Sequence, residues 1–457
     1  MNSTTETLLT GSRRPPLLLS RVIVIYMALA LVPYVFSVTQ GLEQRDLFPT
    51  LISALSIAGL TALFAQYALS GRLQSVTQYA GIDNGMRIHR KAGEIIALFF
   101  FLHPFLIVLP RFWIAPQLAV DDLWLMLTSS ESATGVYAWA LMGFWVVFAM
   151  LRDKLPITYE AWRISHGIGL VAVAILATWH AVTVGRHGVY QPWFDVMWIA
   201  MCTVAVSTLV YTYFVRPSMQ KRKPFKIVDV RKEGLSDWSL TIEQDGDFDF
   251  DFDAGQFVWI NTSGNPFNRK EHPFTIASSP ASLPQISFVI RAVGDFTSNL
   301  DQLSAGQRVY VDGPHGAFTL TGRKSAGIAL VAGGCGIAGA LGILRQLRDS
   351  GSGQPVKLVY GNRVMEQMVF QDEISDAGAR LPDFEQVLAV EEPEEGNTSA
   401  YHGQVDSQLL QQTFDNDDRS EWTYYVCGSR GMVDSVVKDL RAMNIPAKQI
   451  LYEQLAF

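Results

Sequence analysis

Long uncharged apolar runs dominate the first half of the chain. Six stretches lack Asp, Glu, Lys and Arg over lengths that cross, or nearly cross, a hydrocarbon core of about 30 Å. They cover residues 22–42, 48–71, 95–110, 132–151, 164–185 and 196–215. The third is the shortest, so its helix must include Arg90, Lys91 and Glu94 in its first turns. The pattern predicts a six-helix transmembrane domain over residues 21–216, preceded by a mobile cytoplasmic tail over residues 1–20.

The pattern changes after residue 216. Short segments of alternating apolar and polar residues, separated by Gly, Asp, Asn and Pro, predict an antiparallel β-barrel over residues 225–320. From residue 324 to 457, an apolar strand, a glycine-rich turn and a helix precede another apolar strand. This order is typical of βαβ units, so we expect an α/β domain with a parallel sheet. The fold class is that of a multi-domain membrane protein.

Charge orients the predicted helices. The formal net charge is −7, which provides no polybasic field for a nucleic acid. Basic residues collect before the first helix, between the second and third, and after the sixth, whereas the alternate loops are mostly acidic. By the positive-inside rule, both termini are expected to be cytoplasmic. The three cysteines lie outside the outward loops, so they support no disulfide framework.

Two of the predicted helices each carry a pair of histidines. His89 and His103 are 14 residues apart, and His166 and His180 repeat this spacing. At about 100° per residue, each pair shares one helix face and spans about 21 Å along the axis. A lone histidine in an apolar helix is usually a hydrogen-bonded core residue, but two matched pairs indicate axial ligands of two stacked b-type haems. We expect His89 to pair with His166, and His103 with His180.

A glycine-rich turn, GGCGIAG at residues 333–339, lies between an apolar strand and a helix. Glycines allow the backbone to approach a pyrophosphate, whose charge the free N–H groups at the helix start can accept. Such a turn alone also serves simply to pack a helix closely. Three further segments strengthen the nucleotide interpretation: HPFTIAS at residues 272–278, GDFT at 294–297 and CGS at 427–429.

Together these segments resemble the ferredoxin-NADP reductase superfamily. More narrowly, over roughly residues 20–457, the chain resembles the transmembrane ferric reductase and NADPH oxidase superfamily, in the form of its simple prokaryotic members. This resemblance implies FAD and a nicotinamide nucleotide as cofactors of the barrel and the α/β domain. It also implies that no protein subunit is obligatory and that the membrane is a bacterial inner membrane.

The resemblance also assigns roles to individual residues. It places Thr275 near the flavin N5, Cys427 near the nicotinamide, and the terminal Phe457 over the flavin ring, as the three catalytic residues. The cofactor-binding residues that it implies are His272, Pro273, Phe274 and Thr275, then Gly294 and Thr297, then Gly333, Gly334 and Gly336, and finally Cys427, Gly428 and Phe457. Two positions depart from the family pattern, because Ala338-Gly339 stands where Thr-Pro is commoner and Ser429 stands where Pro is usual.

Arg363 bears on the choice of coenzyme. It follows the second strand of the α/β domain, where its guanidinium can pair with a 2′-phosphate. No carboxylate ends that strand to bind a free 2′-hydroxyl, so we expect NADPH, with NADH as the alternative. A surface arginine without a ligand is the plainer interpretation of the same residue.

The predicted parts define an electron path across the membrane, from NADPH through FAD and two haems to an external acceptor. We expect O2 as the acceptor, with superoxide as the product, and a ferric chelate as the alternative. Two other classes of protein remain open. One is a haem-binding sensor or transport protein that its nucleotide domain regulates, and the other is a reductase that uses the helices only as an anchor.

Overall fold

The computed structural model describes residues 19–39, 46–70, 73, 76, 81–185, 192–323, 325–392, 400–415 and 418–452. The chain divides into two compact units, and the boundary between them in the sequence lies between Arg216 and Pro217. Each unit is described by itself. Phe457 and nearly all of the expected tail lie outside the described residues.

The first unit is a bundle of long helices. Its helices are α2 (Leu19–Thr39), α3 (Leu47–Leu69), α5 (Ile82–Phe112), α6 (Pro116–Thr128), α7 (Ala133–Met150), α8 (Tyr159–Thr183) and α10 (Pro192–Val210), with a short 3₁₀ turn η1 (Arg152–Lys154). The last helix continues through a π-helical turn η2 (Tyr211–Val215) into α11 (Arg216–Gln220). Among the described residues, six helices are long and apolar enough to cross a membrane. The prediction of six transmembrane helices is therefore confirmed.

Helix α5 is longer than its uncharged stretch. It begins at Ile82 and therefore takes Arg90, Lys91 and Glu94 into its first turns, as its short apolar run required. Lys91 and Glu94 form an ion pair of 2.9 Å on the exposed surface. The helix continues without interruption through Pro104, although a proline removes one backbone hydrogen bond.

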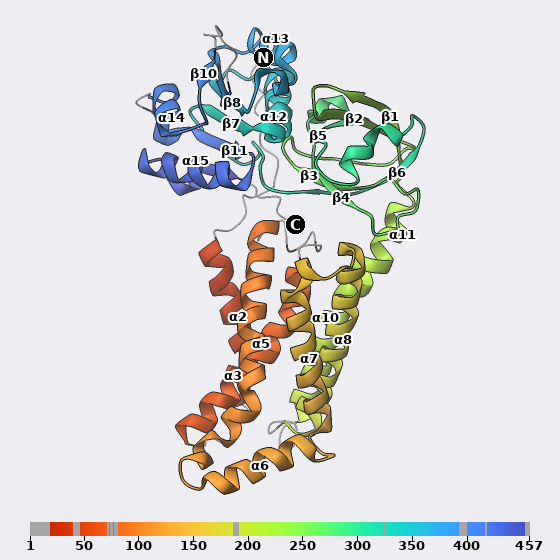
Figure 1. Ribbon diagram of the computed structural model, residues 1–457, viewed down its shortest axis with the longest axis vertical. Helices are drawn as coiled ribbons and strands as arrows, with labels where there is room; N and C mark the ends of the chain where they lie inside the picture. The colour runs from red at the N-terminus through yellow and green to blue at the C-terminus, as the bar shows by residue number, and fades with distance from the viewer. Residues whose placement is uncertain are drawn as a thin grey trace. The chain divides into compact units, whose positions relative to one another are not determined.

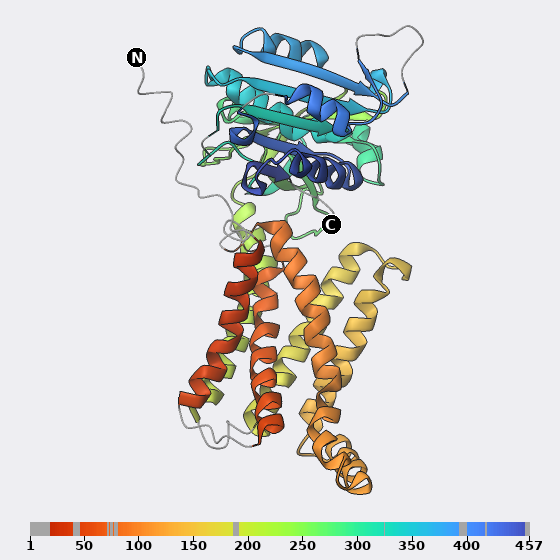
Figure 2. The same cartoon turned by 90° about the vertical axis from the view of Figure 1, so that its left-hand side faces the viewer.

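Helix α6 was not predicted. It is too short to span a bilayer, and Figures 1 and 2 show it lying across one end of the bundle. Asp122 on this helix pairs with Arg111 near the end of α5. Trp124 and Leu125 are exposed on it. Exposed aromatic and aliphatic residues beside charged ones are typical of a helix that lies in a membrane interface.

Helix α3 occupies the middle of the bundle. Its residues Ile57, Leu60 and Phe64 belong to one buried cluster together with Val173 of α8 and Trp198 of α10. The outward faces of the helices are apolar too, as expected for side chains that contact lipid rather than water.

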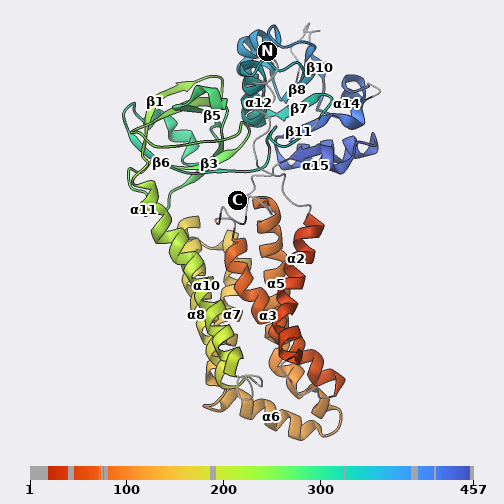
Figure 3. The same ribbon diagram turned by 180° about the vertical axis from the view of Figure 1, so that it is seen from behind.

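The second unit begins with an antiparallel barrel-like sheet, visible in Figure 3. Its strands are β1 (Phe225–Lys232), β2 (Asp237–Gln244), β3 (Phe257–Asn261), β4 (His272–Thr275), β5 (Gln285–Arg291) and β6 (Arg308–His315). They are ordered β4-β3-β6-β1-β2-β5. Alternate residues point inward, so that Leu240, Ile242 and Phe288 are fully buried in the barrel core.

A parallel α/β domain follows in the same unit (Figure 2). Its strands are β7 (Ile328–Gly333), β8 (Val356–Asn362), β9 (Phe384–Val390), β10 (Tyr401–His402), β11 (Thr423–Cys427) and β12 (Ile450–Tyr452), and its helices are α12 (Ile337–Asp349), α13 (Gln371–Gly378), α14 (Ser407–Thr413) and α15 (Arg430–Ala442). The strand order is β10-β9-β8-β7-β11-β12. The order reverses between β7 and β11, and such a switch point is where open α/β sheets bind ligands.

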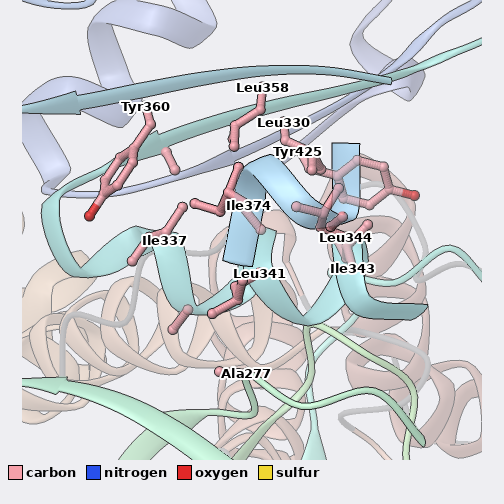
Figure 4. Close-up of a cluster of buried hydrophobic side chains, with 14 of the residues drawn as sticks. Ala277, Leu330, Ile337, Leu341, Ile343, Leu344, Leu358, Tyr360, Ile374 and Tyr425 are labelled. Atoms are coloured by element: carbon pink, nitrogen blue, oxygen red, sulfur yellow. The ribbon is translucent and has the colours of Figure 1, made fainter. Parts of the chain in front are cut away.

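Buried residues cover both faces of this sheet. Leu330 and Leu358 contribute to one cluster, with α12, and Ala329 and Val331 to the other, with α15. Figure 4 shows α12 with Leu341 and Leu344 between the strands and Ala277 of the barrel. The barrel and the α/β domain therefore share part of a core. The six-helix, antiparallel and parallel parts of the expected fold class are all confirmed.

Candidate functional site

The four membrane histidines lie on two helices of the bundle. Helix α5 carries His89 and His103, and α8 carries His166 and His180. His103 and His180 line the same cavity, and His89 and His166 each lie 14 residues earlier on the same two helices. The spatial neighbours are thus the pairs expected from the sequence.

Helix α3 orients both histidines of α5. The backbone carbonyl of Gln66 lies 3.2 Å from His89 Nδ1. A carbonyl can only accept, so Nδ1 carries the proton and Nε2 keeps its lone pair. His103 Nδ1 lies 3.4 Å from Ser56 Oγ, whose hydroxyl already donates to the carbonyl of Ile52 at 2.7 Å. Ser56 therefore accepts from His103, which again leaves Nε2 available as a ligand atom.

The two histidines of α8 have different surroundings. Trp162 stacks on His166, with 5.1 Å between the ring centroids. A Cβ atom at Gly135 of α7 would lie 2.6 Å from the His180 ring, so this glycine permits the helix to approach the imidazole. In the described part of the chain, the Nδ1 atoms of His166 and His180 are buried without a hydrogen-bond partner.

A cavity of about 480 Å³ separates part of α5 from α8. His103 and His180 both line it, together with Ser56, Gly135 and mostly apolar residues of α3 and α7. None of its lining residues is Asp, Glu, Lys or Arg. No group of three His, Cys, Asp or Glu side chains that could hold a metal ion occurs in the ranges that the structure covers. Two imidazoles that line one apolar cavity fit the residues that would hold a haem.

In the second unit, the segment HPFT forms β4 at the edge of the barrel sheet. Phe257 of β3 is paired with Thr275, and Ile260 with His272. His272, Pro273, Phe274 and Thr275 are all half-buried. A half-buried strand at a sheet edge can present side chains and backbone to a bound cofactor.

The segment GDFT packs against this strand. Phe296 stacks on His272 at 4.1 Å between ring centroids, with 5° between the ring planes. The hydroxyl of Thr297 accepts from the N–H groups of Val293 and Gly294 at 3.0 and 2.9 Å. The fold therefore brings the two expected flavin-binding segments together. In this conformation the Thr297 hydroxyl stabilises its own turn.

The glycine-rich loop and the CGS segment also meet. Gly333 ends β7, and Gly334 and Gly336 form the 3₁₀ turn η5 (Gly334–Gly336) before α12. A Cβ atom at Gly336 would collide with the carbonyl oxygen of Cys427 and lie 2.8 Å from the nitrogen of Gly428. Gly334 has a φ of +56°, which favours glycine. Cys427 ends β11 beside β7, so these residues share the switch point of the sheet.

The two departures from the family pattern have structural roles. Gly339 lies where a Cβ would approach Phe318 to 3.1 Å and the methyl group of Thr275 to 3.6 Å. This glycine lets α12 pack closely on the barrel. Ser429 is the N-cap of α15, since its side chain accepts from the Met432 nitrogen at 3.4 Å.

The sequence reasoning missed Arg291. This arginine ends β5 and forms two hydrogen bonds with the buried carboxylate of Asp237, at 2.9 and 3.1 Å. Its Nη1 atom would lie 2.6 Å from a Cβ at Gly334, so the guanidinium borders the glycine-rich loop. An arginine held in place beside such a loop is suited to binding a phosphate. Its position directly before AVGDFT was the available signal.

Arg363 has a partner that the sequence did not reveal. Its guanidinium is exposed and lies 3.2 Å from Glu392, which follows the neighbouring strand β9. The two segments are also joined through the backbone, because Glu392 N donates to the carbonyl of Arg363 at 2.9 Å. A carboxylate is therefore present at this sheet edge, although it does not follow β8 itself.

Arg345 connects α12 with the barrel. It forms two hydrogen bonds with Glu373, at 2.7 and 2.6 Å, and donates to the carbonyl of Ala277 at 2.8 Å and to Ser287 at 3.2 Å. Burial raises the pKa of Glu373, but the hydrogen bonds and charge of Arg345, together with the charge of Arg348, lower it by more, so the net shift is downward.

We expect Arg345→Gln to destabilise the soluble unit by about 2 kcal/mol at pH 7, after allowing for the partial exposure of Glu373. Because the folded pKa of Glu373 is lowered, its contribution is present above the ordinary carboxylate pKa and is lost as the pH falls through the folded value. Denaturant unfolding at several pH values measures the difference. The exposed Arg441→Gln is the control, and an equal loss in both variants contradicts the bridging role.

Three family models match successive parts of the chain. A ferric-reductase-like transmembrane component matches residues 55–178, an FAD-binding domain matches residues 223–319, and an oxidoreductase NAD-binding domain matches residues 330–438. The transmembrane match contains His89 and His103 of α5 and His166 of α8, and it ends two residues before His180.

Several curated proteins are similar to part of the chain. The reductase component of propane 2-monooxygenase from Mycolicibacterium goodii is 27% identical over 44% of this chain and 58% of its own length. The electron transfer component of toluate 1,2-dioxygenase from Pseudomonas putida is 30% identical over the same shares. NADH-cytochrome b5 reductase 1 from Candida glabrata is 25% identical over 42% of this chain and 68% of its own. The chain thus spans little more than half the length of the first two relatives.

Solved structures resemble half of the chain. The ferredoxin reductase in carbazole 1,9a-dioxygenase is 25% identical, with a TM-score of 0.44 over 50% of this chain and 68% of its own. A ferredoxin NADP+ reductase from Neisseria gonorrhoeae with bound FAD and NADP is 19% identical, with a TM-score of 0.42 over 50% of this chain and 97% of its own.

The family models agree with the order of the folded parts. A ferric-reductase-like transmembrane component precedes an FAD-binding and an NAD-binding domain in one chain. Six membrane-length helices, an antiparallel sheet and a parallel sheet occur in the same order. The chain is therefore an integral membrane protein with the domain architecture of the ferric reductase and NADPH oxidase superfamily, in which a membrane component precedes FAD-binding and NAD-binding domains.

Proposed function

We propose that the protein carries electrons from NADPH through FAD and two b-type haems to O2 on the far side of the membrane, forming superoxide. The observation that carries this proposal is that α5 and α8 each carry two histidines 14 residues apart, and that His103 and His180 line one apolar cavity. The same chain contains the FAD-binding and NAD-binding domains that supply such a path.

The bound groups would supply hydride transfer from the nicotinamide, its division into single electrons at the flavin, and a one-electron relay at the haem irons. The chain's own residues would position them. Gln66 and Ser56 hold the α5 imidazoles with Nε2 free, so that His89 and His103 can each ligate an iron from one side. His166 and His180 would hold the same two groups from α8.

In the soluble unit, the N–H groups of Gly334 and Gly336 at the start of α12 would bind the coenzyme pyrophosphate. The flavin would lie along β4, with the Thr275 hydroxyl near its N5 atom. No hydrogen bond within the described part of the chain uses that hydroxyl. Cys427 at the end of β11 would lie beside the nicotinamide. Phe457 is proposed to cover the flavin ring until the nicotinamide replaces it.

Arg363 favours NADPH over NADH as the donor. Its guanidinium is exposed at the end of β8, where a 2′-phosphate could displace Glu392. Glu392 already compensates the charge of Arg363, so the gain from the 2′-phosphate is smaller than an unpaired arginine would give. The expected preference is therefore for NADPH, with measurable use of NADH.

The cavity beside the outer pair favours O2 as the acceptor. It is lined by His103, His180 and mostly apolar residues, without an Asp, Glu, Lys or Arg side chain. An uncharged lining admits a small neutral molecule and offers no cation to attract an anionic ferric chelate. His103 and His180 would hold the haem at this cavity, and the haem would supply single electrons to the acceptor. The match to a ferric-reductase-like component favours the second candidate, a ferric-chelate reductase.

The distribution of charged residues supports the orientation of the path. Basic residues before α2, between α3 and α5, and after α10 would lie on the cytoplasmic side with both termini and the soluble unit. The proposed location is a bacterial inner membrane, with no obligatory protein subunit.

Product identification tests the proposal. Purified protein with NADPH is offered O2, using cytochrome c reduction as the readout, and in a separate anaerobic reaction it is offered ferric citrate. We expect most cytochrome c reduction to be inhibited by superoxide dismutase, and slow reduction of ferric citrate. Cytochrome c reduction that superoxide dismutase does not inhibit contradicts the oxidase assignment. A matched reaction with NADH measures coenzyme preference.

Anaerobic stopped-flow spectroscopy separates the proposal from a sensor or transport protein. We expect NADPH to reduce the flavin first and the haem absorption bands afterwards. If FAD is bound and reduced while the haem bands remain oxidised, the electron path fails.

A further inference from the structure

A second cavity in the soluble unit lies away from the proposed nucleotide site. Its volume is about 260 Å³, and its lining includes Arg323, Ser325, Gln354, Thr423 and Tyr425. Thr423 is the first residue of β11, and Ile328, which also lines the cavity, is the first of β7. The cavity therefore adjoins the amino-terminal edge of the parallel sheet. Cys427 at the opposite edge is about 13 Å away along the strand.

Two hydrogen-bond donors of this cavity are buried without partners. Thr423 is 0% exposed, and its Oγ1 atom has no partner among the described groups. The same holds for the Nε atom of Arg323. A buried donor that lacks an acceptor destabilises a fold by about 1–3 kcal/mol. Both donors occur in one cavity, so a single acceptor-rich ligand can satisfy both.

Arg323 also lacks a compensating charge. Within the ranges that the structure covers, no carboxylate forms an ion pair with it, and its aromatic neighbour Tyr425 donates its hydroxyl hydrogen to the carbonyl of Thr319. Burial lowers the pKa of the Arg323 guanidinium, and Tyr425 opposes this by less. A partly buried cation without a counter-charge is less stable than a paired one, and a bound anion would stabilise it.

The remaining polar groups define what the cavity can accept. The Ser325 hydroxyl donates to the carbonyl of Gly327 at 2.5 Å, so its proton is already used. Gln354 donates one amide hydrogen to the carbonyl of Ser325 at 2.6 Å and keeps a second hydrogen. Arg323, Thr423 and Gln354 therefore each retain a donor that a ligand in the cavity can use. The volume exceeds the roughly 30 Å³ that one water molecule occupies in the liquid.

We propose that this cavity binds a small oxyanion, of the phosphate or carboxylate class, between Arg323, Thr423 and Gln354. Arg323 lies in the connection between β6 of the barrel and β7 of the α/β domain. Thr423 and Gln354 belong to the α/β domain itself. The anion would thus link the connection to the sheet, at the edge opposite the nucleotide loop, and would stabilise the soluble unit without occupying the coenzyme site.

Inorganic phosphate is the first probe. Calorimetric titration of the full-length, FAD-loaded protein, at pH 7 and constant ionic strength set with chloride, measures its affinity, and acetate in a second titration distinguishes a carboxylate site from a phosphate site. Arg323→Gln is expected to weaken binding about tenfold or more, because a charged hydrogen bond is lost. Thr423→Val should weaken it by a smaller factor.

Two further variants show which site of the soluble unit binds the phosphate. Arg419→Gln removes an exposed arginine of the same domain that pairs with Asp415, and Arg363→Ala removes the proposed phosphate contact of the coenzyme site. Both should retain the phosphate affinity of the unchanged protein. Without added anion, Arg323→Gln should be at least as resistant to thermal unfolding, since it removes an uncompensated charge. This distinguishes a loss of binding from misfolding.

Two results would contradict the proposed oxyanion site. If neither anion binds the unchanged protein, there is no oxyanion site. If binding survives in Arg323→Gln but is lost in Arg363→Ala, phosphate occupies the coenzyme site and the inference is wrong. NADPH oxidation without phosphate should be equal in the unchanged protein and in Arg323→Gln. The absence of an oxyanion site would therefore leave the proposed electron path unaffected.

Discussion

Replacing His103 with alanine is expected to lower electron transfer to the external acceptor by about a hundredfold or more. Loss of a residue that only hydrogen-bonds to a metal ligand already lowers activity by up to about a hundredfold, and loss of the ligand itself should have at least that effect. The variant loses one of two proposed iron ligands at the cavity that His180 also lines. Haem content should fall from two towards one per FAD. Reduction of a soluble dye by NADPH should continue, because the soluble unit is unchanged.

The control for this variant is His402→Ala, which removes an exposed histidine of β10. It should keep both haems and full activity towards the external acceptor. The outcome that contradicts the proposed path is a His103→Ala protein that is folded, contains less haem, and still reduces the external acceptor at the full rate. That result would favour helices that serve only as an anchor.

Replacing Gly336 with alanine should lower kcat/KM for NADPH by about a hundredfold, because a misplacement of about 1 Å can have that effect on hydride transfer. A Cβ at this position collides with the carbonyl of Cys427, so either the glycine-rich loop or the CGS segment must shift. Steady-state kinetics with a soluble dye measure the effect. Bound FAD should remain, since the nearest atoms to a Cβ at Gly336 belong to Cys427 and Gly428 rather than to β4 or the GDFT turn.

Gly431→Ala is the matched control in the same CGSRGM segment. Nothing lies within 4 Å of a Cβ placed there, and Gly431 is in the first turn of α15. Alanine should leave kinetics unchanged and stabilise the helix by about 0.5–1 kcal/mol. Equal kinetics in Gly336→Ala and Gly431→Ala would show that the loop does not position the coenzyme.

Periodicity was sufficient to predict the elements that long uniform patterns specify. The uncharged stretches predicted the six spans, and the change to alternating residues predicted the antiparallel sheet. Helix α6 was missed because Asp121 and Asp122 interrupt its apolar residues, and because a helix of 13 residues can lie along an interface without a long apolar run.

The candidate sites were predictable where a motif is contiguous. The Gly333–Gly336 turn and the His272–Thr275 strand were each located from their own residues. The fold brings the turn beside the CGS segment and the strand beside the GDFT segment. Their chemical roles remain predictions. Arg291 and Asp237 are 54 residues apart, and nothing local signals that they pair. The partner of His89 is a backbone carbonyl, which has no sequence signature at all.

The unequal support of the histidines has a consequence for how the proposed haems would be lost. The α5 imidazoles are fixed against rotation by α3, through Gln66 and Ser56, whereas the described surroundings of His166 and His180 provide no such bond. An imidazole that can turn about its Cβ–Cγ bond dissociates from a metal more readily than one held at Nδ1. On the proposed assignment, α8 is the labile side, and ligand exchange would begin there.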